Sequence, residues 1–348
     1  MSGKRVLVTG ASGFLGISLV HELVRRGYLA RGFDLEPFTD GDLHGKAESI
    51  VGDIRDKDAV FRASVGADYV IHNAAVLPVS RSNRRIFRDV NVNGTRNILE
   101  ASLDNRVEKL IFISSSAPYG IPREHPINER TGFNPVCDYG RSKIEAENVC
   151  GDFRKKGLNV VILRPRTIVG AGRMGILQIL LSWIEDNKNI YIIGDGNNLF
   201  SLISDSDLVE AVILALEKDC GNEDFNLGTD VFSTVREDLR KLINSVNSAS
   251  RIISIPAGPA KFILGILDAF GLVPFTRWHY MTPDKDFYFD ISKAKNALGW
   301  RPKMSNVDAL KAGYDYYLSN RKKLDSDYGI THRKSLRQRA LKLLKKIS

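Results

Sequence analysis

The chain has 348 residues, of which 43% are hydrophobic, and this is enough for a sizeable core in one large or two smaller domains. Its net charge of +9 is unevenly distributed, because residues 321–348 hold ten Lys and Arg against two Asp. The remainder is nearly neutral, which excludes a general affinity of the body of the protein for nucleic acid.

Cysteine usage and the N-terminus indicate the compartment. Cys137, Cys150 and Cys220 form neither a CxxC pair nor a Cys/His cluster, which argues against a disulfide framework and against a metal site. The first residues lead directly into a strand pattern, so we expect no signal peptide. No apolar run reaches the roughly 20 residues that cross a bilayer. We therefore expect a cytoplasmic protein, with peripheral attachment to the inner face of a membrane as the alternative.

Short apolar runs alternate with helical patterns over the first half of the chain. The first run, residues 4–9, ends in glycines, and the helical pattern at 14–26 stops at Gly27. Further strands are expected at residues 29–34, 49–52, 68–73, 109–114 and 159–164, and further helices at 56–64, 86–104 and 139–156. This alternation predicts the α/β class, with a doubly wound parallel sheet that carries helices on both faces.

The pattern changes at Gly170-Ala171-Gly172. Helices at 176–187, 206–217 and 235–246 are then mixed with short strands at 190–193 and 224–227. We interpret this part as a smaller, mixed substrate-binding cap. The predicted domains are residues 1–170 for the sheet, 171–320 for the cap and 321–348 for a basic tail, with some later segments returning to the sheet.

A glycine motif joins the first strand to the first helix. Gly10, Gly13 and Gly16 permit a tight turn and a close approach of the backbone to a pyrophosphate, and the helix start at Phe14 and Leu15 offers N–H groups and a positive dipole end. Asp34 ends the second strand, where a carboxylate accepts hydrogen bonds from an adenosine ribose and repels a 2′-phosphate. The motif therefore predicts NAD in preference to NADP.

The GxxGxxG spacing resembles the extended branch of the short-chain dehydrogenase/reductase superfamily, the NAD-dependent epimerase/dehydratase family, over residues 4–318. This branch includes nucleotide-sugar epimerases, dehydratases and 3β-hydroxysteroid dehydrogenases. The resemblance implies a Rossmann sheet that binds NAD. It also implies further cofactor contacts from Asp53 and Ile54, from the loop Asn73-Ala74-Ala75, and from Asn91 on the central helix.

Tyr139 and Lys143 are four residues apart, so a helix places them on one face. An ammonium group beside a phenol favours the phenolate, and the same lysine can donate to a nicotinamide ribose hydroxyl. Tyr139 is then a general base for alcohol oxidation and a general acid for ketone reduction. Taken alone the pair also fits an ordinary surface helix, but behind the glycine motif it predicts catalysis.

A third group is expected to bind the substrate oxygen. Ser114, Ser115 and Ser116 follow the strand at 109–114, at the edge of the sheet where ligands bind. Matching Tyr119-Gly120 to the family's motif places the catalytic hydroxyl at Ser115, with Ser116 as the rival. Family members that eliminate water or decarboxylate carry an acid next in the chain, whereas Ser116 and Ala117 follow here. Epimerisation or simple alcohol/ketone oxidoreduction remains.

The substrate is less well determined by the sequence. Many nucleotide-sugar enzymes of this branch clamp the diphosphate with an arginine a few residues after a Gly-Asp-Gly turn, here residues 194–196, but Phe200 occupies that position. Arg166, Arg173 and Arg277 remain open as substitutes. We expect an NAD-dependent epimerase or related oxidoreductase of a nucleotide sugar or lipid-linked sugar, in envelope glycan synthesis. The alternatives are a 3β-hydroxysteroid-type dehydrogenase of an apolar alcohol and a non-catalytic NAD-binding protein.

Two late segments suggest partners. Residues 259–275 are markedly apolar and predict either a buried cap helix or a lipid-facing patch. Residues 333–347 predict a basic amphipathic helix on an anionic membrane, although a solvated tail or a helix docked on a partner subunit also fits. No nucleic-acid-binding module is present in the pattern. The family resemblance further implies a homodimer through the helices at 86–104 and 139–156.

Overall fold

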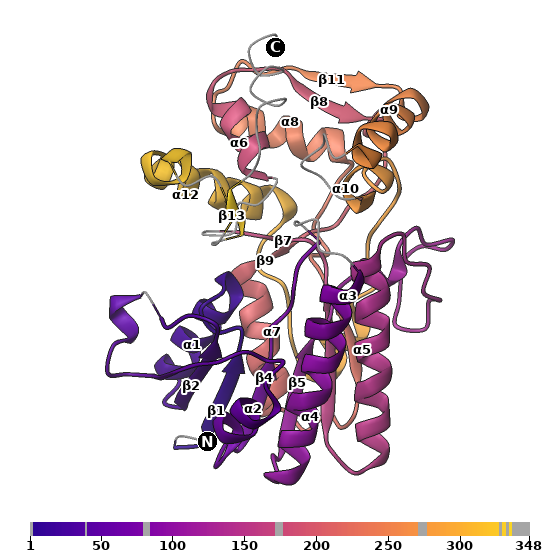
Figure 1. The fold of residues 1–348 in the computed structure, drawn as a ribbon. Coiled ribbons are helices and arrows are strands. Elements are labelled where there is room, and N and C mark those ends of the chain that lie inside the picture. Colours follow the sequence, from indigo (N-terminus) through magenta and orange to yellow (C-terminus); the bar gives the residue numbers. More distant parts are fainter. Residues whose placement is uncertain are drawn as a thin grey trace.

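The computed structural model describes residues 3–38, 40–78, 84–170, 177–270, 277–326, 329–331 and 334–335. A larger lobe built on a sheet lies at the bottom of Figure 1, and a smaller lobe lies above it.

A seven-stranded parallel sheet forms the larger lobe, in the order β3-β2-β1-β4-β5-β6-β10. Its strands are β1 (Arg5–Thr9), β2 (Leu29–Asp34), β3 (Glu48–Val51), β4 (Tyr69–His72), β5 (Lys109–Ile113), β6 (Val160–Pro165) and β10 (Asp224–Leu227). The direction of winding reverses between β1 and β4, and ligands of such sheets bind at the carboxyl ends of the strands on either side of the reversal. The predicted α/β class with a doubly wound Rossmann sheet is confirmed.

Both faces of the sheet are covered because successive strand residues point to opposite sides. Val6 and Val8 of β1 are fully buried in a core with α1 (Phe14–Arg25) and α7 (Asp205–Glu217). Leu7 is fully buried in the opposite core, which it shares with α2 (Lys57–Ser64), α4 (Gly94–Asp104) and α5 (Asp138–Lys155). This explains why the strands read as continuous apolar runs.

The helix expected at 86–104 is divided into three parts, so this prediction is wrong in detail. A short α3 (Arg84–Phe87) leads into a π-helical turn, Arg88–Asn93, and then into α4. The Thr95 hydroxyl donates to the carbonyl of Asn91 at 2.6 Å and stabilises the wide turn. Apolar spacing alone does not reveal such a turn, which in other proteins often marks a functional site.

The smaller lobe has its own core, which includes Trp183, Leu242 and Tyr317. It is built from α6 (Leu177–Glu185), β8 (Ile190–Ile193), α8 (Val235–Ser245), β11 (Ile252–Ile255) and α12 (Asn306–Ser326). A two-stranded pair, β7 (Ile168–Val169) with β9 (Ile203–Ser204), lies where the lobes meet, and α9 (Ala257–Ala269) and α10 (Arg277–Met281) lie on one side (Figure 1).

Two elements assigned to the cap belong instead to the large sheet. Strand β10 pairs with β6, and α7 packs against α1 and β5. Helix α11 (Ser292–Leu298) also contacts β10 and α7. All six residues of β6 are buried, so its outer edge needs a partner strand, and a local sequence pattern cannot say which later strand supplies it. A single boundary at residue 170 therefore does not separate the lobes.

The tail also differs from the prediction. Helix α12 continues past residue 320, and its Arg321 pairs with Asp186 at 2.8 Å and with Glu185 at 3.3 Å. Gly329–Thr331 (β12) then pairs antiparallel with Lys334–Ser335 (β13), so a helix that starts at 333 is wrong for those two residues. The rest of the predicted basic helix, residues 336–347, lies outside the described residues. No helix in the described ranges is long and apolar enough to cross a membrane.

Candidate active site

The glycine loop is held so tightly that side chains are excluded at two positions. Gly10 has a φ of +69°, and a Cβ there would lie 2.8 Å from the backbone of Ala74. A Cβ on Gly16 would lie 2.1 Å from the carbonyl oxygen of Gly10. The start of α1, at Phe14 and Leu15, is thereby pressed against the end of β1. The loop thus brings the positive end of a helix dipole to the crevice where the sheet reverses.

Asp34 lies beside this loop, as the sequence predicted. Its carboxylate accepts the backbone N–H of Ser12 at 3.0 Å and that of Leu35 at 2.6 Å. The first contact ties the end of β2 to the glycine loop and fixes the carboxylate. Since each carboxylate oxygen accepts more than one hydrogen bond, the group keeps capacity for the two hydroxyls of a ribose.

Asp53 and Ile54, for which the resemblance implies cofactor contacts, lie in different environments. The guanidinium and backbone N–H of Arg55 donate to Asp53, with a shortest contact of 2.5 Å, and this interaction lowers the pKa of the Asp53 carboxyl. Ile54 is buried, and a Cβ on Gly94 of α4 would lie 2.8 Å from its side chain. Ile54 therefore packs its loop closely against α4. The carboxylate of Asp53 is already hydrogen-bonded to Arg55.

The loop after β4 closes the other side of the crevice. Asn73 donates from its side-chain amide to the carbonyl of Gly10 at 3.2 Å, and the N–H of Ala74 donates to the Thr9 hydroxyl at 3.2 Å. Ala75 follows and is half-buried. The loop after β4 is therefore held against the glycine loop by Asn73 and Ala74. Direct contact of the cofactor with Asn73, Ala74 and Ala75 stays a prediction.

Asn91 is placed as a positioning residue. Its side-chain oxygen accepts the N–H of Val76 at 2.8 Å, and its amide donates to the carbonyl of Val76 and to the hydroxyl of Ser142 at 3.0 Å. Asn91 is 1% exposed, and its side-chain amide forms these hydrogen bonds with other groups of the protein. It ties the loop after β4 to α5 and acts on the site through them. The resemblance had implied a cofactor contact here.

The three serines after β5 have different environments. The Ser114 hydroxyl donates to Glu147 in a buried contact, and the Ser116 hydroxyl accepts from the guanidinium of Arg166 at 3.2 Å. Ser115 is half-buried, and its hydroxyl oxygen accepts the N–H of Ala117 at 3.1 Å, which leaves its proton for a substrate oxygen. The Ser116 hydroxyl also keeps its proton, but Ser116 is only 4% exposed, so the greater access to Ser115 favours Ser115 for the substrate oxygen.

Helix α5 carries Tyr139 and Lys143 into the same region. Both are buried, and the Lys143 Nζ lies 6.0 Å from the centre of the Tyr139 ring. Lys143 donates to the carbonyl of Ile113, the last residue of β5, at 2.9 Å. Burial lowers its pKa to about 8, although the charge of Glu147 works in the opposite direction. Two of its three N–H groups remain for a ribose hydroxyl and for the phenol.

Sequence reasoning missed two residues that support this lysine. Glu147 lies one helical turn beyond Lys143 and pairs with Arg164 of β6 at 2.7 Å, each side chain 5% exposed. The Tyr139, Lys143 and Glu147 spacing of four was the signal that could have revealed it. His72 is fully buried between the Thr9 and Thr95 hydroxyls, and burial lowers its pKa to about 3. A neutral imidazole therefore adds no second positive charge near Lys143.

The comparisons with known proteins agree with this geometry. The model of the NAD dependent epimerase/dehydratase family matches residues 6–228. The chain belongs to this family. It is 31% identical to UDP-glucose 4-epimerase of Lactobacillus helveticus over 88% of this chain and 95% of that protein. It is 33% identical to N-acetyl-alpha-D-glucosaminyl-diphospho-ditrans,octacis-undecaprenol 4-epimerase of Escherichia coli O157:H7, over 60% and 61%. The solved UDP-glucose 4-epimerase of Thermotoga maritima with UDP-glucose has a TM-score of 0.76 at 28% identity, over 92% of this chain and 99% of that chain.

Family membership confirms two expectations, that the protein is an enzyme and that its cofactor is NAD. The alternative of a non-catalytic NAD-binding protein is thereby set aside. The residues present fit NAD. A Cβ would fill the cradle at Gly10 and Gly16, and Asp34 offers a carboxylate at the end of β2. Among the described residues, no group of three or more His, Cys, Asp or Glu is placed to hold a metal ion.

The substrate side of this epimerase/dehydratase family member contains an unusual arginine. Arg166 follows β6, is 1% exposed, and its guanidinium carbon lies 4.4 Å from the ring centre of Phe200 and 3.9 Å from that of Phe287. It donates to the carbonyl of Ser201 and to Ser116, while its Nη2 finds no partner among the described residues. Of the other two arginines left open, Arg277 is exposed on α10 and Arg173 lies outside the described residues.

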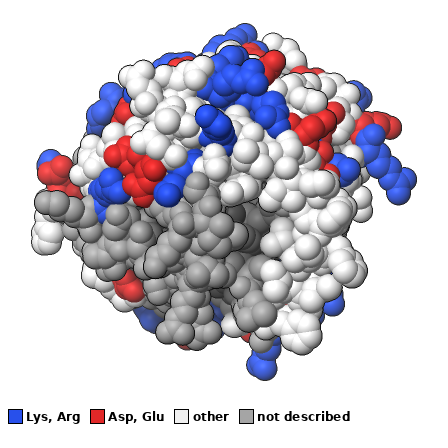
Figure 2. Space-filling view, turned by 90° about the horizontal axis from the view of Figure 1, so that it is seen from above, with Lys and Arg blue, Asp and Glu red and all other residues white. Residues whose placement is uncertain are grey.

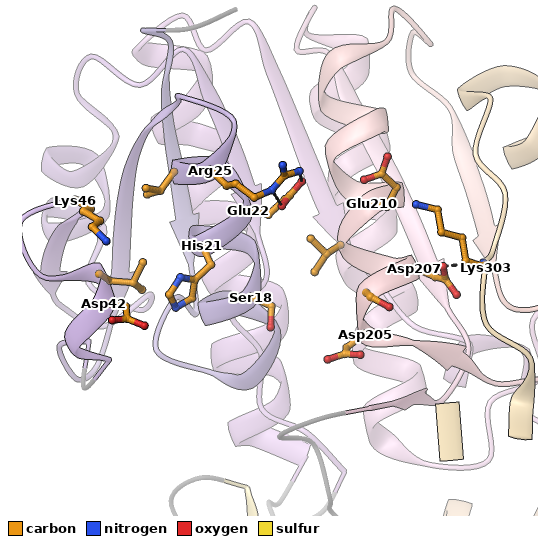
Figure 3. Close-up of a pocket in the computed structure, with 14 residues that line it drawn as sticks. Ser18, His21, Glu22, Arg25, Asp42, Lys46, Asp205, Asp207, Glu210 and Lys303 are labelled. Atoms are coloured by element: carbon orange, nitrogen blue, oxygen red, sulfur yellow. Dashed lines mark hydrogen bonds and ion pairs between the residues drawn. The ribbon is translucent and has the colours of Figure 1, made fainter. Parts of the chain in front are cut away.

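A separate hollow of about 910 Å³ lies between α1 and α7 (Figure 3). In its lining Glu22 pairs with Arg25 at 2.6 Å, and the backbone N–H of Lys303 donates to the Asp207 carboxylate at 2.8 Å. None of the predicted site residues lines it. It is a polar surface groove on the outer side of these two helices, and it carries none of the expected chemistry.

Proposed function

We propose that this enzyme epimerises a sugar carried on a diphosphate, with nucleotide sugars as the first substrate class. The observation that carries the proposal is that Ser115 and the Tyr139–Lys143 pair lie at the same end of the sheet as the glycine loop. Similarity to UDP-glucose 4-epimerases along most of the chain supports the same reading.

In this proposal Tyr139 takes the proton of a sugar hydroxyl while Ser115 donates a hydrogen bond to the same oxygen. Lys143 stabilises the phenolate and donates to the nicotinamide ribose, which orients the cofactor against the substrate. NAD, when held by the glycine loop and Asp34, would supply reversible hydride transfer to either face of the carbon that bears this oxygen. Tyr139 then gives back the proton, so that no net oxidation occurs.

The loop after β5 supports epimerisation over elimination. Loss of water needs an acid and a base in addition to the tyrosine. The residue after Ser115 is Ser116, whose hydroxyl is buried against Arg166, and Ala117 follows. A dehydratase or decarboxylase is therefore disfavoured.

The carrier of the sugar is either a nucleotide or a lipid. The relative that acts on an undecaprenol-linked sugar supports a lipid carrier and a place in envelope glycan synthesis. The basic C-terminal segment supports peripheral contact of residues 333–347 with a membrane at the cytoplasmic face. We also propose a homodimer through α4 and α5, which pack against each other on one face of the sheet; the test is the mass of the protein in solution.

A 3β-hydroxysteroid-type dehydrogenase is the second candidate. Phe200 stands where a diphosphate-binding arginine is expected, and its ring contacts Arg166 and Phe287 in an aromatic cluster. This cluster favours an apolar alcohol as substrate.

Cofactor retention distinguishes the two candidates. An epimerase regenerates its NAD in each cycle, so the purified enzyme should contain NAD and convert UDP-glucose to UDP-galactose, or the corresponding lipid-linked sugar, without added cofactor. Absolute dependence on added NAD would reject epimerisation. Formation of one NADH per oxidised sterol, with no response to nucleotide sugars, would establish the dehydrogenase.

A further inference from the structure

Helix α9 presents an apolar face to solvent. Only Ala260 of its thirteen residues is buried. Phe262 is 70% exposed, Ile263 55%, Ile266 44% and the following Phe270 77%. These residues recur at helical spacing and therefore share one face. The alternative of a buried cap helix for residues 259–275 is thus wrong for α9.

Both charged residues of α9 turn inward. Lys261 pairs with Asp284 at 2.5 Å, with the two side chains 18% and 11% exposed. Asp268 accepts the hydroxyl of Tyr280 on α10 at 2.9 Å. A surface helix normally buries its apolar side and exposes its charges, and α9 does the reverse. Two polar contacts hold it in this orientation, so the exposed face is a fixed feature of the cap.

The opposite side of α9 faces the rest of the cap. Helix α9 packs on α10, and Trp278 of α10 contacts Phe287 at 5.7 Å between ring centres. Trp278 also packs against the cluster that contains Tyr139, Phe87 and Ala117. Trp278 therefore links α10 to the aromatic residues around Tyr139. Seen from above, the side of the cap that carries α9 in Figure 1 shows a broad area without charged side chains (Figure 2).

The size and charge of the face indicate its partner. At 70% and 77% exposure, Phe262 and Phe270 present roughly 300 Å² together, and the two isoleucines add less. This is well below the roughly 800 Å² that each partner contributes to a stable protein interface. An anionic lipid surface also attracts the basic residues concentrated after position 321.

We propose that the exposed face of α9 is a membrane-docking surface that inserts Phe262, Ile263, Ile266 and Phe270 into the headgroup boundary of an anionic lipid layer. Apolar insertion and electrostatic attraction by the basic segment then act together. This inference goes beyond the proposed function, because attachment to lipid does not depend on turnover or on the sugar.

Co-sedimentation of the full chain with vesicles tests this surface. The variants are the double change Phe262→Ser and Phe270→Ser, and the control Phe61→Ser, which removes a 41% exposed phenylalanine from α2 in the other lobe. With mixed phosphatidylcholine–phosphatidylglycerol vesicles, the double variant should bind roughly tenfold more weakly or worse, and the control should bind like the unmodified protein.

Salt separates the two contributions. High salt screens the basic segment but not apolar insertion, so the binding that remains at high salt should be lost in the double variant. NAD content and turnover of a water-soluble nucleotide sugar should stay unchanged in that variant, which keeps this test distinct from that of the proposed function. Unaltered vesicle binding by the double variant would overturn the proposal, and a change from dimer to monomer in that variant would then assign the face to a second copy.

Discussion

Gly140 holds Tyr139, the proposed general acid and base, against the loop that carries Ser115. A Cβ at this position would lie 2.7 Å from the carbonyl oxygen of Ala117 and 3.1 Å from the Cβ of Pro135. The first neighbour is backbone, so it cannot rotate away. Gly140→Ala therefore forces α5 and the loop apart by several tenths of an ångström, which alters the distance between Tyr139 and Ser115.

The expected effect is a loss of kcat by about 10- to 100-fold, since a misplacement of about 1 Å costs about 100-fold in positioned catalysis. The KM for substrate should change much less. The best control is Gly151→Ala in the same helix, because a Cβ there meets nothing within 4 Å. Helix propensity favours Ala over Gly by about 1 kcal/mol, so Gly151→Ala should raise the unfolding free energy and leave kcat unchanged.

Urea unfolding and steady-state turnover of the substrate found by the cofactor-retention experiment measure both quantities. At Gly140 the clash should cancel or exceed the gain in helix propensity, so that stability does not rise. If Gly140→Ala instead stabilised the protein as much as Gly151→Ala and kept full kcat, the close approach of α5 to the serine loop would have no catalytic importance.

Three further changes probe the site. Tyr139→Phe should lower turnover by at least about 100-fold and leave bound NAD in place; retained turnover would remove the tyrosine from the mechanism. Asp34→Ser should weaken NAD binding and reduce the discrimination against NADP, as measured by calorimetry with each cofactor, and an unchanged preference would mean that another acid holds the ribose. Because burial lowers the pKa of Lys143 to about 8, the unfolded chain binds more protons than the apo fold between about pH 8 and the ordinary lysine value of 10.5. The unfolding free energy of the unmodified protein relative to Lys143→Met should therefore rise with pH across this window, by on the order of 3 kcal/mol, and a flat difference in urea titrations would contradict the buried charge.

Much of the cofactor half is determined locally in the sequence. The glycine spacing, the apolar strand before it and the carboxylate at the end of the next strand are close in the chain, and the structure places Gly10, Gly16 and Asp34 together. The four-residue spacing of Tyr139 and Lys143 likewise needs only a helix. These features depend on backbone geometry over a few residues, which a sequence pattern encodes directly.

The tertiary structure decided what depends on contacts between distant segments. It favours Ser115 over Ser116, because Ser116 is buried against Arg166, fifty residues away. It gave Asn91 a positioning role through Val76 and Ser142, and it moved β10 from the cap to the edge of the sheet. It also exposed the apolar face of α9, since hydrophobic spacing shows that a helix has an apolar side but not whether another element covers it.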